Sequence, residues 1–215
     1  MVEYPEDRSE VEMDCPPPIV KTRRRLPHWY LDGATYFVTF RLADSVPQSV
    51  LRAWREERDT WLRNNPPPRN VEQEREYRRS LEGNRQKWLD AGHGSCVLKT
   101  PEVAQIMADT LMHFDGQRYS IGDFVVMPNH VHLLVHPHSE HQLSKIVHSW
   151  KSYSAHCINK LLGRAGKLWQ EESYDHIVRS EAQLAHFRRY IAENPVKARL
   201  TSGEYLLMMR ESPEE

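Results

Sequence analysis

The 215-residue sequence predicts an α+β fold, a ferredoxin-like antiparallel sheet with helices on one face and a helical insertion after the first strand. Two observations support this prediction. The apolar residues follow, in order, the periods of a strand, a helix, a strand hairpin, a helix, a strand and a final helix. The length and a hydrophobic content of 39% suit one core better than two full-sized domains.

Residue types define the individual elements. The first strand is rich in β-branched and aromatic residues, the first core helix opens with Pro101, and Ser180 is placed to cap the last helix. Pro195 disfavours a helical Asn194, which should therefore stand at the helix boundary. The predicted elements are strand 35–42, a short extended piece at 96–98, helix 101–114, strands 119–127 and 130–136, helix 142–162, strand 168–178 and helix 180–195.

Charge and composition divide the chain into three parts. Residues 1–20 carry six acidic side chains and one basic one, residues 204–215 carry four and one, and the centre is therefore basic although the net charge is -1. We predict a flexible tail over 1–27, a catalytic domain over 28–203 with a helical insertion at about 47–92, and an acidic tail over 204–215. Acidic tails around a basic centre suit a nucleic-acid binder, and equally well suit tails that only aid solubility.

Several classes of protein are disfavoured. No apolar run approaches the roughly 20 residues that span a membrane, and the acidic N-terminus is unlike a secretory signal. The three cysteines are far apart and lack the spacing of a disulfide framework or a zinc ribbon. We therefore expect a cytoplasmic protein without a membrane partner.

The stretch around His130 and His132 carries the first sign of chemistry. Strand side chains alternate, so both imidazoles share one face, while Val131 and Leu133 point into the opposite, apolar face. The pattern indicates a half-buried strand that offers two nitrogen ligands, which is half of a metal site. Two polar-face histidines exposed to water are the alternative.

A second motif lies about sixty residues downstream. In the predicted last helix, Tyr190 and Asn194 are four residues apart and share a face, so a phenol and an amide oxygen stand side by side. The pair could supply a nucleophile and a further ligand to the histidine site.

These motifs resemble a known family. Residues 125–135 with His130-Val131-His132, followed by residues 190–198 with Tyr190 and Asn194, are similar to the single-tyrosine HUH transposases (IS200-like transposases), most closely to their REP-associated tyrosine transposase (RAYT) branch. The resemblance covers roughly residues 23–201. It implies a metal-dependent endonuclease and strand transferase that cuts single-stranded DNA next to hairpins and stays joined to it through a 5′-phosphotyrosine. It also implies DNA transposition or recombination by a monomer or homodimer.

The residues are suited to that chemistry. We assign Tyr190 as the nucleophile and His130, His132 and Asn194 as ligands of Mg²⁺ or Mn²⁺, which would polarise the phosphodiester as a Lewis acid. Asn194 often corresponds to a glutamine in the wider group, and its shorter side chain resembles the RAYT branch. Basic residues are the candidate DNA contacts: Arg23, Arg24, Arg25, Lys151, Arg188 and Arg189.

Other interpretations remain open. Tyr190 could be a core aromatic, and Tyr153 or Tyr174 could be the nucleophile, although Tyr153 lies on the apolar stripe of a helix and should pack in the core. The histidines at 136, 138 and 141 could form a zinc site, but solvated loop histidines explain them better. A hairpin-binding regulator with little or no catalysis is the alternative function, and an RNA-recognition module is disfavoured because no strand carries its glycine-aromatic motif.

Overall fold

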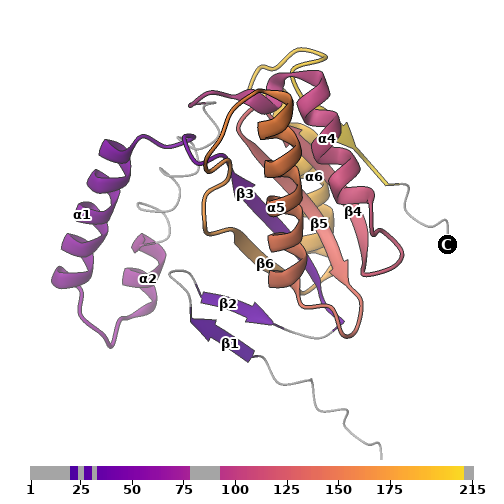
Figure 1. Cartoon of the computed structure of the whole chain (residues 1–215). Helices are drawn as coiled ribbons and strands as arrows, with labels where there is room; N and C mark the ends of the chain where they lie inside the picture. The colour runs from indigo at the N-terminus through magenta and orange to yellow at the C-terminus, as the bar shows by residue number, and fades with distance from the viewer. Residues whose placement is uncertain (1–19, 24–26, 31–32, 78–92, 211–215) are drawn as a thin grey trace, which may run out of the picture.

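The computed structural model describes residues 20–23, 27–30, 33–77 and 93–210 (Figure 1). Within these residues, the central sheet has the strand order β6-β3-β5-β4-β7, and every neighbouring pair is antiparallel. Its strands are β3 (Thr35–Arg41), β4 (Tyr119–Met127), β5 (His130–Pro137), β6 (Tyr174–Val178) and β7 (Leu206–Met208). The helices packed on the sheet are α4 (Pro101–Met112), α5 (Leu143–Leu161) and α6 (Glu181–Lys197).

The first part of this domain has the predicted ferredoxin-like order. The chain runs β3-α4-β4-β5-α5-β6. In the sheet, β6 and β3 lie on one side of β5, and β4 lies on the other side. The α+β prediction is confirmed, and most element boundaries agree with the predicted ones to within a few residues. The β4–β5 turn is held from outside, because the carbonyls of Pro128 and Asn129 accept hydrogen bonds from the backbone amides of Leu98 and Leu42 at 3.1 and 2.9 Å.

Both faces of the sheet are buried, which the sequence analysis did not anticipate. One face, with Val131, Leu133 and Val135 of β5, packs under α4 and α5 in the larger core. The opposite face packs under α6 around Phe37 and Ile191. In Figure 1, α5 lies in front of the sheet and α6 behind it. The prediction of helices on one face therefore holds for α4 and α5 and is wrong for α6, because strands with apolar residues on both sides need a helix over each face.

Helix α6 begins as predicted and ends later than predicted. The Ser180 side chain accepts a hydrogen bond from the Gln183 amide, which makes it the N-cap. The helix continues through Pro195 to Lys197, and the Ala198 amide donates to the Asn194 carbonyl at 3.0 Å. Asn194 thus lies inside the helix and not at its boundary. Pro195 has no backbone N–H, so it cannot donate a hydrogen bond to the carbonyl four residues back, and the helix ends two residues later.

The C-terminal region extends the domain beyond residue 203. Strand β7 pairs with β4, and buried Asp123 holds the chain that follows it. Asp123 accepts hydrogen bonds from the Arg188 guanidinium and from the Arg210 backbone amide, each at 2.7 Å. Arg210 also pairs with Asp115. Residues 204–210, which we had assigned to an acidic tail, therefore belong to the folded part of the chain; residues 211–215 lie outside the described residues.

Further elements surround the domain. The insertion after β3 contains α1 (Gln48–Asn64) and α2 (Val71–Tyr77), which project to one side of the sheet (Figure 1), and residues 78–92 lie outside the described residues. Near the N-terminus, β1 (Val20–Arg23) and β2 (Pro27–Tyr30) form a small antiparallel hairpin where we had expected a tail. Residues 97–99 form a 3-10 turn (η2) in place of the expected extended piece. None of the described helices combines the length and the apolar character needed to cross a membrane.

Candidate active site

His130 and His132 lie on the face of β5 that α6 covers. Their cross-strand partners on β3 are Arg41 and Thr39, and paired residues of neighbouring strands share a face. The two imidazole rings are 4.5 Å apart between centroids and nearly perpendicular, and each residue is only 1% exposed. The shared face is as predicted, but the half-buried strand is not: the histidine face is as deeply buried as the apolar one.

The tautomer of His130 follows from its neighbours. The amide nitrogen of Asn129 donates to the His93 carbonyl at 2.8 Å, which leaves its Oδ1 as an acceptor. This oxygen lies 2.7 Å from His130 Nδ1. Nδ1 must therefore carry the proton in a neutral ring, and Nε2 keeps its lone pair.

His132 has an equivalent partner on the neighbouring strand. Its Nδ1 lies 2.7 Å from the hydroxyl oxygen of Thr39, which is itself buried. A hydroxyl can accept this hydrogen bond, again leaving Nε2 with a lone pair. A hydrogen bond at one ring nitrogen that orients the other is the usual arrangement around metal-binding histidines.

Both imidazoles are held neutral. Burial lowers the pKa of His130 well below its usual range, and the neighbouring His132 and the positive charge of Arg41 lower it further. The pKa of His132 is lowered in the same way, by burial and then by Arg41. A neutral imidazole is the protonation state that binds a metal ion.

Helix α6 brings the second motif to the histidines. The Tyr190 ring meets the His132 ring edge to face at 5.1 Å between centroids and the Phe37 ring at 5.8 Å. Asn194 lies one turn further on the same helix face and is 3% exposed. Two motifs sixty residues apart in sequence thus form one cluster, in which Tyr190 is partly buried and the other residues are buried, because α6 packs on the histidine face of the sheet.

The unpartnered polar atoms of the fold concentrate in this cluster. Among the described residues, four buried side-chain nitrogen or oxygen atoms have no hydrogen-bond partner, and three of them are His130 Nε2, His132 Nε2 and Asn194 Oδ1. Burying such an atom without a partner costs about 1–3 kcal/mol. Imidazole nitrogens and an amide oxygen are donor types that bind divalent metal ions.

The structure adds residues that the sequence analysis missed. Thr39, Arg41 and Asn129 contact or lie close to the two histidines, yet none belongs to a motif recognised in the sequence. Alternation along 35–42 would have placed Thr39 and Arg41 on one face of their strand. Only the pairing of β3 with β5 shows that this face is the histidine face.

The rival residues lie elsewhere. Tyr153 is 61% exposed on α5, across the sheet from the histidines, so the prediction that it packs in the core is wrong. Tyr174 lies on β6 as the cross-strand partner of Thr39, so strand β3 lies between it and His132. His138 is hydrogen-bonded to Ser120 and the Gln117 carbonyl, and within the described residues no three His, Cys, Asp or Glu side chains gather as a metal site.

The predicted DNA contacts are dispersed. Arg189 is exposed on α6 next to Tyr190, whereas Arg188 is paired with buried Asp123. The Arg188 ion pair indicates a structural role. Arg23 ends β1, and Arg24 and Arg25 lie outside the described residues.

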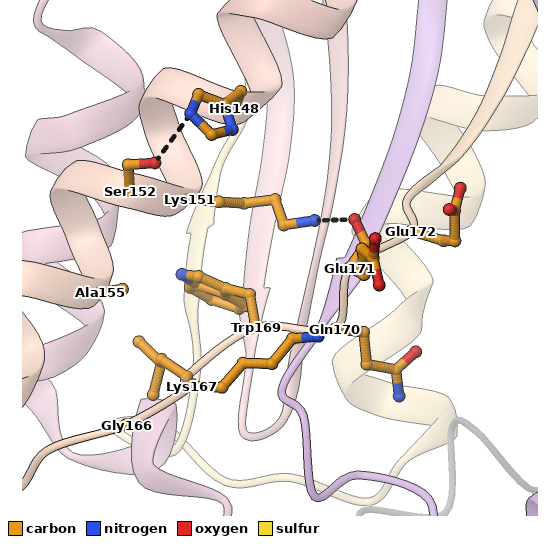
Figure 2. Close-up of a pocket in the computed structure, with 11 residues that line it drawn as sticks. His148, Lys151, Ser152, Ala155, Gly166, Lys167, Trp169, Gln170, Glu171 and Glu172 are labelled. Carbon is orange, nitrogen blue, oxygen red and sulfur yellow. Dashed lines mark hydrogen bonds between the residues drawn. The ribbon is translucent and has the colours of Figure 1, made fainter. Parts of the chain in front are cut away.

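Lys151 lines an open surface cavity of about 710 Å³ between α5 and residues 166–172 (Figure 2). Its ammonium group donates to the Glu171 backbone carbonyl at 2.8 Å. Lys167 and His148 also line the cavity, as do Glu171 and Glu172, so its charges are mixed. Its walls include Trp169, which belongs to the core under α4 and α5, so the cavity is separate from the histidine cluster.

Comparisons with known proteins agree with the motifs. Residues 99–194, which include both histidines, Tyr190 and Asn194, match the family model described as Transposase IS200 like. A comparison with curated protein sequences finds no match. Solved structures similar to this chain include a REP-associated tyrosine transposase bound to a REP hairpin, with 17% identity, a TM-score of 0.40, and coverage of 81% of this chain and 74% of that one. Another is a candidate transposase from Deinococcus radiodurans R1, with 18% identity, a TM-score of 0.40, and coverage of 81% and 98%.

Proposed function

We propose that this chain, whose residues 99–194 match the IS200-like transposase model, cuts and rejoins single-stranded DNA through a covalent tyrosine intermediate. One observation carries the proposal. Three buried polar atoms without partners, on His130, His132 and Asn194, lie in the cluster that α6 forms with β5, and Tyr190 is the phenol in that cluster.

The donor atoms suggest how a metal would be held. His130 and His132 would bind Mg²⁺ or Mn²⁺ through Nε2, and Asn194 through its amide oxygen. When bound, the ion would supply Lewis acidity to a phosphodiester oxygen. Asn129 and Thr39 hold the two rings by their Nδ1 atoms, so the lone pairs keep their direction without a metal.

Tyr190 is the proposed nucleophile. Its phenol oxygen attacks the scissile phosphorus and loses its proton, a bond from this oxygen to phosphorus forms, and the bond from phosphorus to the 3′-oxygen breaks. The 3′-oxygen takes up a proton and leaves as a hydroxyl. Because the phosphotyrosine is still a phosphodiester, a 3′-hydroxyl can reverse the step, and joining requires no ATP.

Two further side chains act on this step. The buried positive charge of Arg41, close to both imidazoles, favours binding of a phosphate group near them. The Tyr190 ring covers His132 in this structure, and the Nε2 atoms of both histidines are buried. We therefore infer that the Tyr190 side chain or α6 shifts when DNA binds, so that a phosphodiester can lie between the phenol and the imidazoles.

One chain supplies all four proposed active-site residues, and the protein would act as a monomer or as a homodimer. The proposed substrate is single-stranded DNA next to a hairpin, which rests on the resemblance of residues 190–198 to the REP-associated branch. The cytoplasmic location expected from the sequence is part of the same proposal.

The test is detection of the covalent intermediate. Protein incubated with Mn²⁺ and labelled single strands that carry hairpins should give a denaturation-resistant protein–DNA adduct, which peptide mass spectrometry maps to Tyr190. Tyr190→Phe should abolish the adduct while keeping the ring contacts with Phe37 and His132. Tyr153→Phe, on the opposite side of the sheet, is the matched control and should leave the adduct unchanged.

The same assay separates the two candidate functions. Specific hairpin binding without an adduct, across substrates and in both Mg²⁺ and Mn²⁺, would favour a binding regulator. An adduct on Tyr174 would keep the enzyme and move its nucleophile to β6.

A further inference from the structure

We propose that Tyr174 is a stacking platform for one base of the single strand that occupies the active site. This subsite rests on the proposed function, because it assumes that single-stranded DNA is the substrate. Tyr174 is an aromatic side chain that is 52% exposed on the histidine face of the sheet. Tyrosine has an apolar ring with a polar tip, and nucleic-acid bases stack on such rings.

The pairing of three strands places Tyr174 relative to the histidines. Tyr174 pairs with Thr39, and Thr39 pairs with His132, to which it is also hydrogen-bonded. Paired residues share a face, and neighbouring strands are about 4.8 Å apart. The backbone of Tyr174 is therefore about 10 Å from that of His132, measured across the sheet.

Helix α6 covers this face only in part. His176, two residues further along β6 on the same face, lies against Phe187 of α6 with ring centroids 5.4 Å apart. Phe187 also stacks on Phe37 at 4.4 Å. Tyr174 itself is 52% exposed, so about half of its surface reaches solvent. The exposed phenol thus lies on the same sheet face as His132, with Thr39 between them.

The position fits a base close to the cut phosphate. Stacked nucleotides rise about 3.4 Å each along a strand, so a separation of about 10 Å corresponds to two or three nucleotides. Stacking on an aromatic ring tolerates every base, because each has a π-face. Tyr174 would therefore hold the strand in register with Tyr190 without selecting a sequence at that base.

The test compares strands with and without bases. The full-length protein is titrated, with EDTA present to prevent cleavage, with a fluorescent oligothymidine and with the same phosphodiester backbone made of abasic sugars. Both strands carry the same charge, so the ratio of their affinities isolates base contacts. Tyr174→Ala should weaken oligothymidine binding by about 5- to 150-fold, the range for loss of one stacked base, and should leave binding of the abasic strand unchanged.

Two variants serve as controls. Tyr174→Phe keeps the ring and should bind as the wild type does. Tyr153→Ala removes a phenol that is similarly exposed but lies on α5, and should change neither affinity. A photocrosslink from a bromodeoxyuridine strand to the wild-type protein should map to Tyr174, which tests the contact even if Tyr174→Ala folds poorly.

Other outcomes overturn the inference in distinguishable ways. If the wild type prefers oligothymidine and Tyr174→Ala keeps that preference, the platform is wrong and the proposed function stands. If the wild type binds neither single strand, the stacking platform is wrong, and the proposed function, whose substrate carries a hairpin, is decided by the adduct assay. An equal loss of affinity for both strands in Tyr174→Ala would show a structural effect and refute the stacking contact.

Discussion

Replacing Thr39 by valine tests how the site prepares its histidines. Valine keeps the shape of threonine and suits a strand, so the change removes little more than one hydroxyl. That hydroxyl lies 2.7 Å from His132 Nδ1, and both residues are buried. The variant therefore leaves one imidazole nitrogen without a partner while the neighbouring packing is retained.

The cost to folding follows from that unpartnered nitrogen. A buried polar group that loses its hydrogen bond destabilises a protein by about 1–3 kcal/mol. For a chain of this size, each kcal/mol lowers Tm by about 2–4 °C. We expect Thr39→Val to lower Tm by about 2–12 °C in the absence of metal.

The cost to metal binding has a different origin. Without the Thr39 hydroxyl, the proton of His132 can move to Nε2 and the ring is less well oriented. Loss of such an outer partner typically weakens metal affinity by about 10- to 100-fold. The measurement is calorimetric titration with Mn²⁺, together with thermal unfolding with and without Mn²⁺.

Thr110→Val is the matched control for this prediction. Thr110 is also a buried threonine, but it lies on α4 under the other face of the sheet, where its hydroxyl donates to the Ile106 carbonyl at 2.6 Å. The control should bind Mn²⁺ as the wild type does. Wild-type Mn²⁺ affinity in Thr39→Val, or an equal loss in both variants, would refute the assignment of His132 as an oriented ligand.

Two further predictions concern stability. Burial lowers the pKa of His130 and His132 in the folded state, so below a pH of about 6.5 the unfolded chain binds more protons than the folded chain. The free energy of unfolding without metal should therefore fall as the pH drops below about 6.5. It should fall less steeply in the His130→Asn/His132→Asn variant. Urea unfolding at several pH values measures both slopes, and equal slopes would contradict the buried neutral state. Arg188→Met should lower the free energy of unfolding by about 3 kcal/mol, because it leaves the buried Asp123 carboxylate without its ion pair. Arg189→Met, at an exposed position, should lower it by less than about 0.5 kcal/mol. Similar losses in the two arginine variants, measured by denaturant unfolding, would argue against the structural role of Arg188.

Local periodicity was sufficient to predict much of the fold. The alternation over 119–137 and the helical stripes over 101–114 and 142–162 gave the order of a ferredoxin-like domain, and the structure confirms it. The same local rules predicted that His130 and His132 share a strand face. Neighbouring residues obey such rules because backbone geometry alone decides which side chains point the same way.

Local rules were less informative where a side chain could meet more than one environment. The predicted apolar stripe of helix 142–162 includes Tyr153 and Leu161, but both are exposed in the structure. The stripe is wider than the contact that the sheet provides, so its margins stay in water. Tyr174 shows the opposite case: only its pairing with Thr39 of β3 shows that this exposed residue lies on the histidine face.

The sequence by itself determined the elements, the shared face of the two histidines, and the match of residues 99–194 to the IS200-like transposase model. Only the tertiary structure decided that α6 packs on the histidine face, that both rings are buried and neutral, and that Thr39 and Arg41 of β3 lie beside them. The physical reason is the range of the forces involved. Side-chain direction is set by the residue's own backbone, whereas burial, pKa and hydrogen-bond partners depend on which distant segments pair and pack against it.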